Sequence, residues 1–381
     1  MDAGPIPHRD GRPWRPAGCD TVGLLLQGGG ALGAYQAGVY QGLHEAGLEP
    51  DWLAGVSIGA VNAALIAGNA PEDRVAALQD FWKTVTLRPV WGFLPDGDAL
   101  RKLHNLWSSA MTISLGQPGF FAPHLVSPWF QPRGGAAATS FYDNAPLQET
   151  LMRLVDFDRI NHGAIRFAVG AVDVATGNFA YFDNAETTIL PEHIMASGAL
   201  PPGLPMTQIG TNYYWDGGIV SNTPLQHLLD YIDCEGALVF QVDLFSARGP
   251  IPRDMPEVFG RAKDIQYSSR TRLTTDYYLK SHAQRLQMKR LLAKLPEAQL
   301  SDEERALKVK LASIPAITIL QMIYQQAAHE GQAKDYDFSK SSMRDHWASG
   351  LRDTTKTLAR RDWLEMPAEE HGIVSHDIHR E

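Results

Sequence analysis

Three glycines near the start of the chain have a spacing that suits two different chemistries. Gly28, Gly30 and Gly33 follow the apolar run TVGLLL and fit the G-x-G-x-x-G pattern of a dinucleotide-binding turn. A Gly-Gly-Gly turn can also direct successive backbone N–H groups at one point, where they stabilise a negative oxygen. Such an oxygen forms when an ester is hydrolysed, so the turn alone leaves both hypotheses open.

The residues after the next apolar run favour ester hydrolysis. A dinucleotide site needs an acidic residue at the carboxyl end of the second strand, whereas Glu49 and Asp51 precede that strand, WLAGVS. The strand is followed by GVSIG, a G-x-S-x-G motif centred on Ser57. Between a strand and a helix this motif forms a nucleophile elbow, in which the serine hydroxyl stands clear of the sheet at the N-terminus of the helix. We therefore predict that Ser57 is a nucleophile.

The backbone around these two motifs provides candidate donors to the oxyanion. Removing one such donor costs on the order of 3 kcal/mol of transition-state stabilisation. The expected oxyanion hole consists of backbone N–H groups of Gly28, Gly29, Gly30 and Ile58.

A nucleophilic serine also needs a base, and the preferred candidate is Asp216. It ends the strand-like run YYWD and is followed by two glycines that keep the site open. Its ordinary pKa of about 3.9 makes it a weak base unless apolar surroundings raise that value. None of the thirteen histidines, including His227, His282 and His329, lies in a catalytic motif. A Ser-His-Asp triad in an α/β-hydrolase fold remains the alternative.

The elements that must position these residues alternate between strand and helix. TVGLLL and WLAGVS are expected strands, and each is followed by a small-residue helical pattern, which predicts parallel strands with crossover helices. The run IRFAVGAVDVATGNFAYF (residues 165–182) is typical of a hairpin, and GALVFQVDLF is another strand. The fold class is thus α/β, with a mainly parallel central sheet flanked by helices. Beyond about residue 256 the pattern is helical and charged, although AITILQMIY could return one strand to the sheet.

The composition is that of a globular protein and sets limits on its partners. The chain has 381 residues, is 44% hydrophobic, and carries a net charge of -9, which argues against general nucleic-acid binding. The presence of only two cysteines, Cys19 and Cys234, argues against a disulfide scaffold and favours a cytoplasmic location. No uncharged apolar run reaches the length of a membrane span, so any membrane contact is expected to be peripheral.

Taken in order, these motifs resemble the patatin-like phospholipase family. The resemblance rests on GGGALG from Gly28, GVSIGAVNAA from Gly55, ASGALPPGLP from Ala196 and DGGIVSNTPL from Asp216. It implies a Ser57–Asp216 dyad without a catalytic histidine, an oxyanion hole in the 28–33 loop, and hydrolysis of lipid acyl esters through an acyl-serine intermediate. It implies a three-layer architecture, and it implies no metal and no organic cofactor. The motif-supporting glycines are Gly33, Gly55, Gly59, Gly217 and Gly218.

The resemblance also divides the chain. Residues 1–20 would be a flexible lead-in, 21–245 the acyl hydrolase domain, and 246–381 a mostly helical extension like that of some bacterial members. One departure concerns Leu32, which stands where the family commonly has Arg or Lys. If that cation serves anionic head groups, its absence favours a neutral ester, such as a glyceride, a lysolipid analogue or an intracellular storage polyester. A non-catalytic lipid-binding protein is the third alternative.

Two accessory segments have open interpretations. The aromatic-rich insert at 81–142 forms either an acyl pocket or lid, or a second layer of core. The basic segment Lys280–Lys294 carries leucines among its charges. It is expected to be a solvated helix packed by one face, and contact with a membrane surface is the alternative. The expected partner is a lipid or acyl-ester substrate, with the oligomeric state left open.

Overall fold

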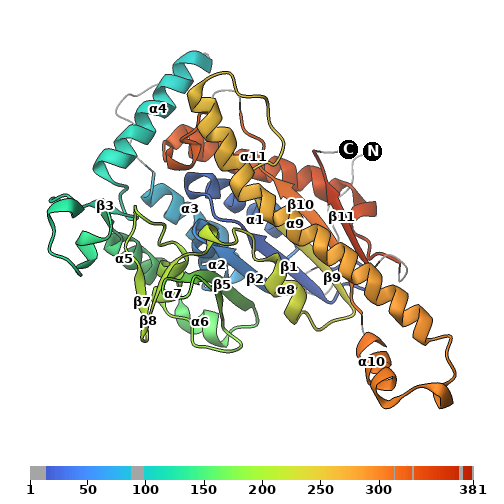
Figure 1. Ribbon diagram of the computed structural model, residues 1–381. Helices are drawn as coiled ribbons and strands as arrows, with labels where there is room; N and C mark the ends of the chain where they lie inside the picture. The colour runs from blue at the N-terminus through green and yellow to red at the C-terminus, as the bar shows by residue number, and fades with distance from the viewer. Residues whose placement is uncertain (1–13, 87–97, 313, 328–329, 369–371, 380–381) are drawn as a thin grey trace.

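The computed structural model describes residues 14–86, 98–312, 314–327, 330–368 and 372–379 (Figure 1). The strands are β1 (Thr21–Leu26), β2 (Trp52–Val56), β3 (Ala122–Pro123), β4 (Tyr142–Asp143), β5 (Arg166–Asp173), β6 (Phe179–Asp183), β7 (Thr207–Ile209), β8 (Asn212–Asp216), β9 (Gly236–Asp243), β10 (Ala316–Ile323) and β11 (Ile373–Asp377). The helices are α1 (Gly33–Glu45), α2 (Ile58–Ala67), α3 (Arg74–Thr84), α4 (Asp98–Leu115), α5 (Ala145–Leu154), α6 (Phe157–His162), α7 (Pro191–Ser197), α8 (Leu225–Tyr231), α9 (Met255–Leu292), α10 (Asp302–Ala312) and α11 (Lys340–Ala359).

A central sheet runs in the order β11-β10-β9-β1-β2-β5-β8-β7, with β6 paired to β5. The pairings from β11 through to β5 are parallel, whereas β6, β7 and β8 join in antiparallel pairs. The predicted mainly parallel α/β fold is therefore confirmed, as is the hairpin predicted at residues 165–182, which forms from β5 and β6. The parallel strands are apolar on both faces, as expected for strands covered by helices on each side.

Helices cover both faces of the sheet and complete the three layers (Figure 1). Leu24 and Leu26 of β1 pack with α1, α2 and α3 in the larger core cluster. Leu25, which points to the opposite face, packs with α8, and α9 joins that side through Leu279. Alternate residues of one strand thus contribute to two cores, which is the consequence of the two-residue period of a strand.

The C-terminal region is built into the same sheet. β10 pairs in parallel with β9 along its whole length, and β11 pairs with β10, so both strands extend the sheet beyond β9. α9 crosses one face of the sheet and α11 packs along α1 on the other (Figure 1). This arrangement brings residues from beyond position 250 close to the glycine-rich turn after β1.

Among the described residues, no helix combines the length and apolar character needed to cross a bilayer.

Candidate active site

Ser57 lies in a sharp turn between β2 and α2. Its backbone φ of 56° and ψ of -126° place a non-glycine residue in a rarely populated conformation, which is the strain expected at a nucleophile elbow. The turn is tight enough that a Cβ on Gly55 would meet the Gly59 backbone at 2.4 Å, and one on Gly59 would meet the Leu26 carbonyl oxygen at 2.2 Å. Glycine is therefore required on both sides of Ser57.

The amide of Ser57 is held by a buried serine from another element. Ser57 N donates to Ser197 Oγ at 3.0 Å, and Ser197 Oγ donates to the carbonyl oxygen of Gly170 at 2.7 Å. Ser197 is the last residue of α7 and is fully buried. The strained turn is thus connected by hydrogen bonds to β5, and the Ser57 side chain remains directed into the pocket described below.

Asp216 ends β8 and meets Ser57 across the sheet. Its side chain is buried, and Oδ1 accepts from Gly218 N at 2.7 Å. Burial raises the pKa of Asp216 to about 6, although the neighbouring Ser57 hydroxyl and the Gly218 amide oppose the rise. The carboxyl is therefore mostly ionised at neutral pH and a stronger base than an exposed aspartate. These are the properties that the dyad hypothesis requires of it.

The glycine-rich turn differs from the prediction at one position. Gly28 N donates to Asn222 Oδ1 at 3.1 Å, and the carbonyl oxygen of Gly28 accepts from Asn222 Nδ2 at 2.9 Å. The expectation that Gly28 is an oxyanion donor is therefore wrong, because its N–H is already paired. The amides of Gly29, Gly30 and Ile58 have no acceptor among the described residues and border the same pocket. These three remain the candidate oxyanion donors.

The other predicted glycines allow close packing around the site. Gly33 lies against Ile58, and Gly217 lies against the Gly170 carbonyl oxygen, which a Cβ on Gly217 would approach to 2.7 Å. Gly218 supplies the amide that Asp216 accepts from, in a short 3-10 turn that follows β8. The structure thus brings together all the predicted motif residues.

Sequence reasoning missed three residues that support the site. Asn222 binds both backbone groups of Gly28, and Ser197 binds the Ser57 amide. Gln27 is fully buried, and its Oε1 accepts from Leu244 N at 2.6 Å. Asn222 and Ser197 lie inside the matching segments DGGIVSNTPL and ASGALPPGLP, but a polar residue in a turn gives no sign of its partner far along the chain.

A cavity of about 160 Å³ opens beside Ser57 and Asp216. Its walls are mostly apolar and aromatic, and they include Phe120, Phe121, Tyr142, Leu200, Leu204, Phe245, Tyr267, Tyr336 and Phe338. The charged residues that line it are Asp216 and Asp335, and no lysine, arginine or histidine is among the described lining residues. The cavity therefore suits an acyl chain and an uncharged ester group.

Two family models match the chain. One, described as patatin-like phospholipase, covers residues 24–229, and that is more than half of the sequence. The chain belongs to the patatin-like phospholipase family. The second model, described as patatin phospholipase, covers residues 265–370 in the C-terminal region.

Individual proteins that resemble this chain match it over shorter stretches. Lysophospholipase nte1 of Aspergillus terreus is 54% identical over 50 residues, which is 13% of this chain and 3% of that protein. An uncharacterized NTE family protein of Mycobacterium tuberculosis is 29% identical over 205 residues, or 54% of this chain and 27% of that protein. The chain thus spans about a quarter or less of the length of these relatives. The crystal structure of VipD from Legionella pneumophila aligns with 89% of this chain and 67% of its own at 16% identity, with a TM-score of 0.40.

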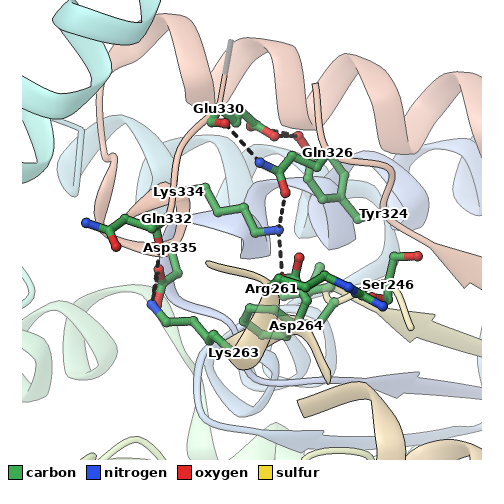
Figure 2. Close-up of polar contacts among 12 residues, drawn as sticks. Ser246, Arg261, Lys263, Asp264, Tyr324, Gln326, Glu330, Gln332, Lys334 and Asp335 are labelled. Atoms are coloured by element: carbon green, nitrogen blue, oxygen red, sulfur yellow. Dashed lines mark hydrogen bonds and ion pairs between the residues drawn. The ribbon is translucent and has the colours of Figure 1, made fainter. Parts of the chain in front are cut away.

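In this patatin-like chain the C-terminal region contacts the glycine-rich turn. A Cβ on Gly30, whose φ is +54°, would lie 2.3 Å from the carbonyl oxygen of Asp335. The Asp335 carboxylate binds Lys263 Nζ of α9 at 2.8 and 3.0 Å, as Figure 2 shows. Burial raises the pKa of Asp335, although the Lys263 ammonium opposes this. The ion pair therefore holds a residue that both lines the cavity and lies against a candidate oxyanion donor.

A second buried set of polar contacts fixes the segment before Asp335. Lys334 Nζ lies 2.9 Å from Asp264 Oδ1 of α9 and 2.9 Å from Gln326 Oε1 (Figure 2). Glu330 accepts from the Tyr324 hydroxyl at 2.7 Å and from buried His346 of α11. The segment is therefore tied to helices on both faces of the sheet.

Two of the histidines considered for a triad, His227 and His282, lie away from the cavity. His227 Nε2 contacts Asp183 Oδ2 at 2.7 Å, and its ring stacks on Tyr181. Burial lowers the pKa of His282 to about 4, and this residue packs against Gly372. The third, His329, lies outside the described residues.

The aromatic-rich insert divides between core, pocket and surface. Phe81 is fully buried, whereas Phe120 and Phe121 line the cavity. Trp129 and Phe130 are exposed on a loop between β3 and β4, and residues 91 and 93 lie outside the described residues. Both alternatives for this stretch, pocket and core, therefore apply to different parts of it.

The basic segment 280–294 occupies the C-terminal part of α9 and the turn after it. Leu286 and Leu292 are buried, whereas Leu291 is exposed, so one face of the helix packs on the protein. This burial agrees with a solvated helix packed by one face.

Proposed function

We propose that this protein is a serine acyl-ester hydrolase that acts on lipids, with Ser57 as nucleophile and Asp216 as base. The observation that carries the proposal is the buried Asp216 carboxyl, which lines the same cavity as Ser57 and whose pKa burial raises to about 6. Beside this pair lie backbone amides that have no acceptor within the described chain. Membership of the patatin-like phospholipase family supports the same activity.

The first half of the proposed reaction forms an acyl-serine. Asp216 takes the Ser57 proton as Oγ attacks the ester carbonyl carbon, and the oxyanion then accepts from the amides of Gly29, Gly30 and Ile58. Collapse of this intermediate breaks the bond to the alcohol, which leaves with the proton held by Asp216. The positive end of α2 lies at Ser57 and favours the negative charge at this point.

The second half hydrolyses the acyl-serine. Asp216 is again ionised and takes a proton from water, which attacks the acyl carbon through a second oxyanion at the same amides. Collapse releases the fatty acid and returns the proton to Ser57. A pKa near 6 suits both roles, because the carboxyl must be ionised to accept a proton and basic enough to hold it.

The lining of the cavity bears on the substrate. An acyl chain would contact aromatic and aliphatic walls, but a phosphate inside the cavity would meet two carboxylates and no cation among the described residues. Together with Leu32 in the glycine turn, this favours an ester whose head group is uncharged or stays outside the cavity. Glycerides, lysolipids and a storage polyester are therefore the first substrates to test, and the lysophospholipase name of one relative supports the second of these.

Replacing Ser57 by Ala tests the proposal directly. The variant should fold and should lose both hydrolysis of p-nitrophenyl butyrate and labelling by a fluorophosphonate probe. Ser375→Ala, which changes an exposed serine on β11, is the control and should keep both.

Labelling of the Ser57→Ala protein at wild-type rate would refute the assignment. A wild-type protein that neither hydrolyses esters nor reacts with the probe would instead favour the non-catalytic lipid-binding alternative. Product profiles from glycerides, lysolipids, diacyl phospholipids and polyesters then rank the substrates.

A further inference from the structure

The loop between β3 and β4 is fixed at the rim of the catalytic cavity. Phe121, directly before β3, and Tyr142 of β4 both line that cavity. Phe141 N also donates to the carbonyl oxygens of Pro202 and Gly203 at 3.1 Å, and these two residues form another part of the cavity wall. A surface that binds this loop would therefore lie next to the proposed active site.

The tip of this loop exposes large apolar side chains. Trp129 and Phe130 are 83% and 82% exposed, and Leu125 is fully exposed. The rings of Trp129 and Phe130 make no ring contact among the described residues, in contrast to Phe121, whose ring packs edge-on against Tyr142. Exposing such side chains to water is unfavourable, so a contiguous group of them indicates a contact surface.

The tip is also separate from the body of the protein. The hydrogen bonds of residues 125–139 within the described chain join partners inside the loop and its ends, such as Gln131 Nε2 to the Val126 carbonyl oxygen at 3.2 Å. A Cβ placed on Gly134 would meet no described atom within 4 Å. The aromatic tip therefore projects away from the fold.

The charges around the loop are unlike those of the rest of the chain. The chain has 43 acidic residues and a net charge of -9, yet positions 99–142 contain no aspartate or glutamate. This stretch holds Arg101, Lys102 and Arg133, of which Arg101 pairs with Asp345 of α11 and Arg133 lies on the loop itself. The loop itself, residues 124–141, thus carries the cation Arg133 and no acidic residue, which suits contact with an anionic lipid surface.

Helix α4 lies next to the base of the loop. It ends beside β3, where the Tyr142 hydroxyl donates to the Ile113 carbonyl oxygen at 2.5 Å. Leu100, Leu103 and Leu106 of α4 are each more than half exposed. In Figure 1 α4 and β3 lie along one edge of the molecule, at the opposite end from α10.

We propose that the β3–β4 loop (residues 124–141) is the element that docks this protein on a lipid surface, with Trp129 and Phe130 inserted among the lipids and Arg133 at the headgroups. Docking there places the mouth of the cavity at the lipid layer, so an acyl ester can enter past Phe121 and Tyr142. The inference rests on the proposed lipid hydrolase function for its purpose, but lipid binding by the loop is a separate property that can be measured without turnover.

The test compares two double variants in the Ser57→Ala background, so that vesicles are not hydrolysed. Trp129→Ser/Phe130→Ser removes the tip, and Leu291→Ser/Val309→Ser removes two exposed apolar side chains at the distant end of α9 and on α10. Binding is measured by co-flotation with vesicles of equal parts phosphatidylcholine and phosphatidylglycerol. The tip variant should bind about a hundredfold more weakly, since each large apolar side chain contributes roughly tenfold when it is inserted. The control should bind like the parent.

The same double changes are then made in the active protein. The tip variant should keep its rate on soluble p-nitrophenyl butyrate and lose rate on esters presented in vesicles. Unchanged vesicle binding by the tip variant would overturn the proposal. So would an equal loss on soluble ester, since the side chains would then act within the cavity, or a change from dimer to monomer, since the loop would then join two copies. If hydrolysis is absent altogether but the tip variant still loses vesicle binding, the docking role stands and the hydrolase assignment fails.

Discussion

Replacing Asp216 by Asn should greatly lower catalytic activity and at the same time change how stability depends on pH. Burial raises the pKa of this carboxyl from 3.8 to about 6, so the folded protein binds the proton more tightly than the unfolded chain. Its contribution to stability is full below about pH 4 and is lost as the pH rises through about 6. Between about pH 5 and pH 7.5 the wild type should lose about 1.4 kcal/mol of unfolding free energy from this group, by proton linkage.

The assay is urea unfolding at both pH values, together with kcat/KM for a soluble ester from about pH 4.5 to 8. In Asp216→Asn the pH-dependent loss of stability from this group disappears, and any constant effect of the amide cancels in the difference. Activity should fall by about a thousandfold, the size of a general-base contribution. In the wild type, kcat/KM should decline tenfold per pH unit below about 6, because the protonated carboxyl cannot accept the Ser57 proton.

Asp243 provides a matched control. It is also buried, and burial raises its pKa to about 6, but it bonds to Thr223 and Gln241 instead of Ser57. Asp243→Asn should therefore remove a similar pH dependence of stability while the acid limb of kcat/KM remains. The reasoning would be refuted if Asp216→Asn stayed active, or if Asp243→Asn removed the acid limb.

Three further substitutions test the support of the site. Asn222→Ala leaves both backbone groups of Gly28 unpaired and should lower kcat for a soluble ester by about tenfold or more. The control, Asn184→Ala, removes comparable hydrogen bonds far from the site and should lower the melting temperature without lowering kcat. Equal losses of kcat in the two variants would contradict the assignment of Asn222. Ser197→Ala removes the acceptor for the Ser57 amide and should slow fluorophosphonate labelling at constant fold content, so unchanged labelling would count against it. Gly30→Ala places a Cβ on a residue with a φ of +54°, 2.3 Å from the Asp335 carbonyl oxygen. It should lower the free energy of unfolding by about 1–3 kcal/mol and should lower activity. Unchanged stability in urea unfolding would exclude this contact.

Much of the candidate site could be predicted because its motifs encode local backbone shape. GVSIG predicts a tight strand-to-helix turn whatever lies around it, and the structure has Ser57 at a φ of 56° in such a turn. The order of apolar runs and small-residue helices predicted a mainly parallel sheet, and the sheet order confirms it. These inferences concern local backbone shape, which depends on residues only a few positions apart in the sequence.

Only the tertiary structure decided which partners these local shapes meet. Gly28 belongs to the predicted donor loop, but its amide is taken by Asn222, and no pattern within the loop predicts that partner. The contact of Asp335 with Gly30 depends in the same way on β9 and β10 extending the sheet beside β1. The basicity of Asp216 likewise comes from burial by several distant segments. The sequence by itself thus determined the candidate nucleophile, the candidate base and the glycine-rich turn. The pairing of distant strands set the hydrogen bonds of these residues and the pKa of Asp216. Both properties depend on which chain segments surround a residue and exclude water from it.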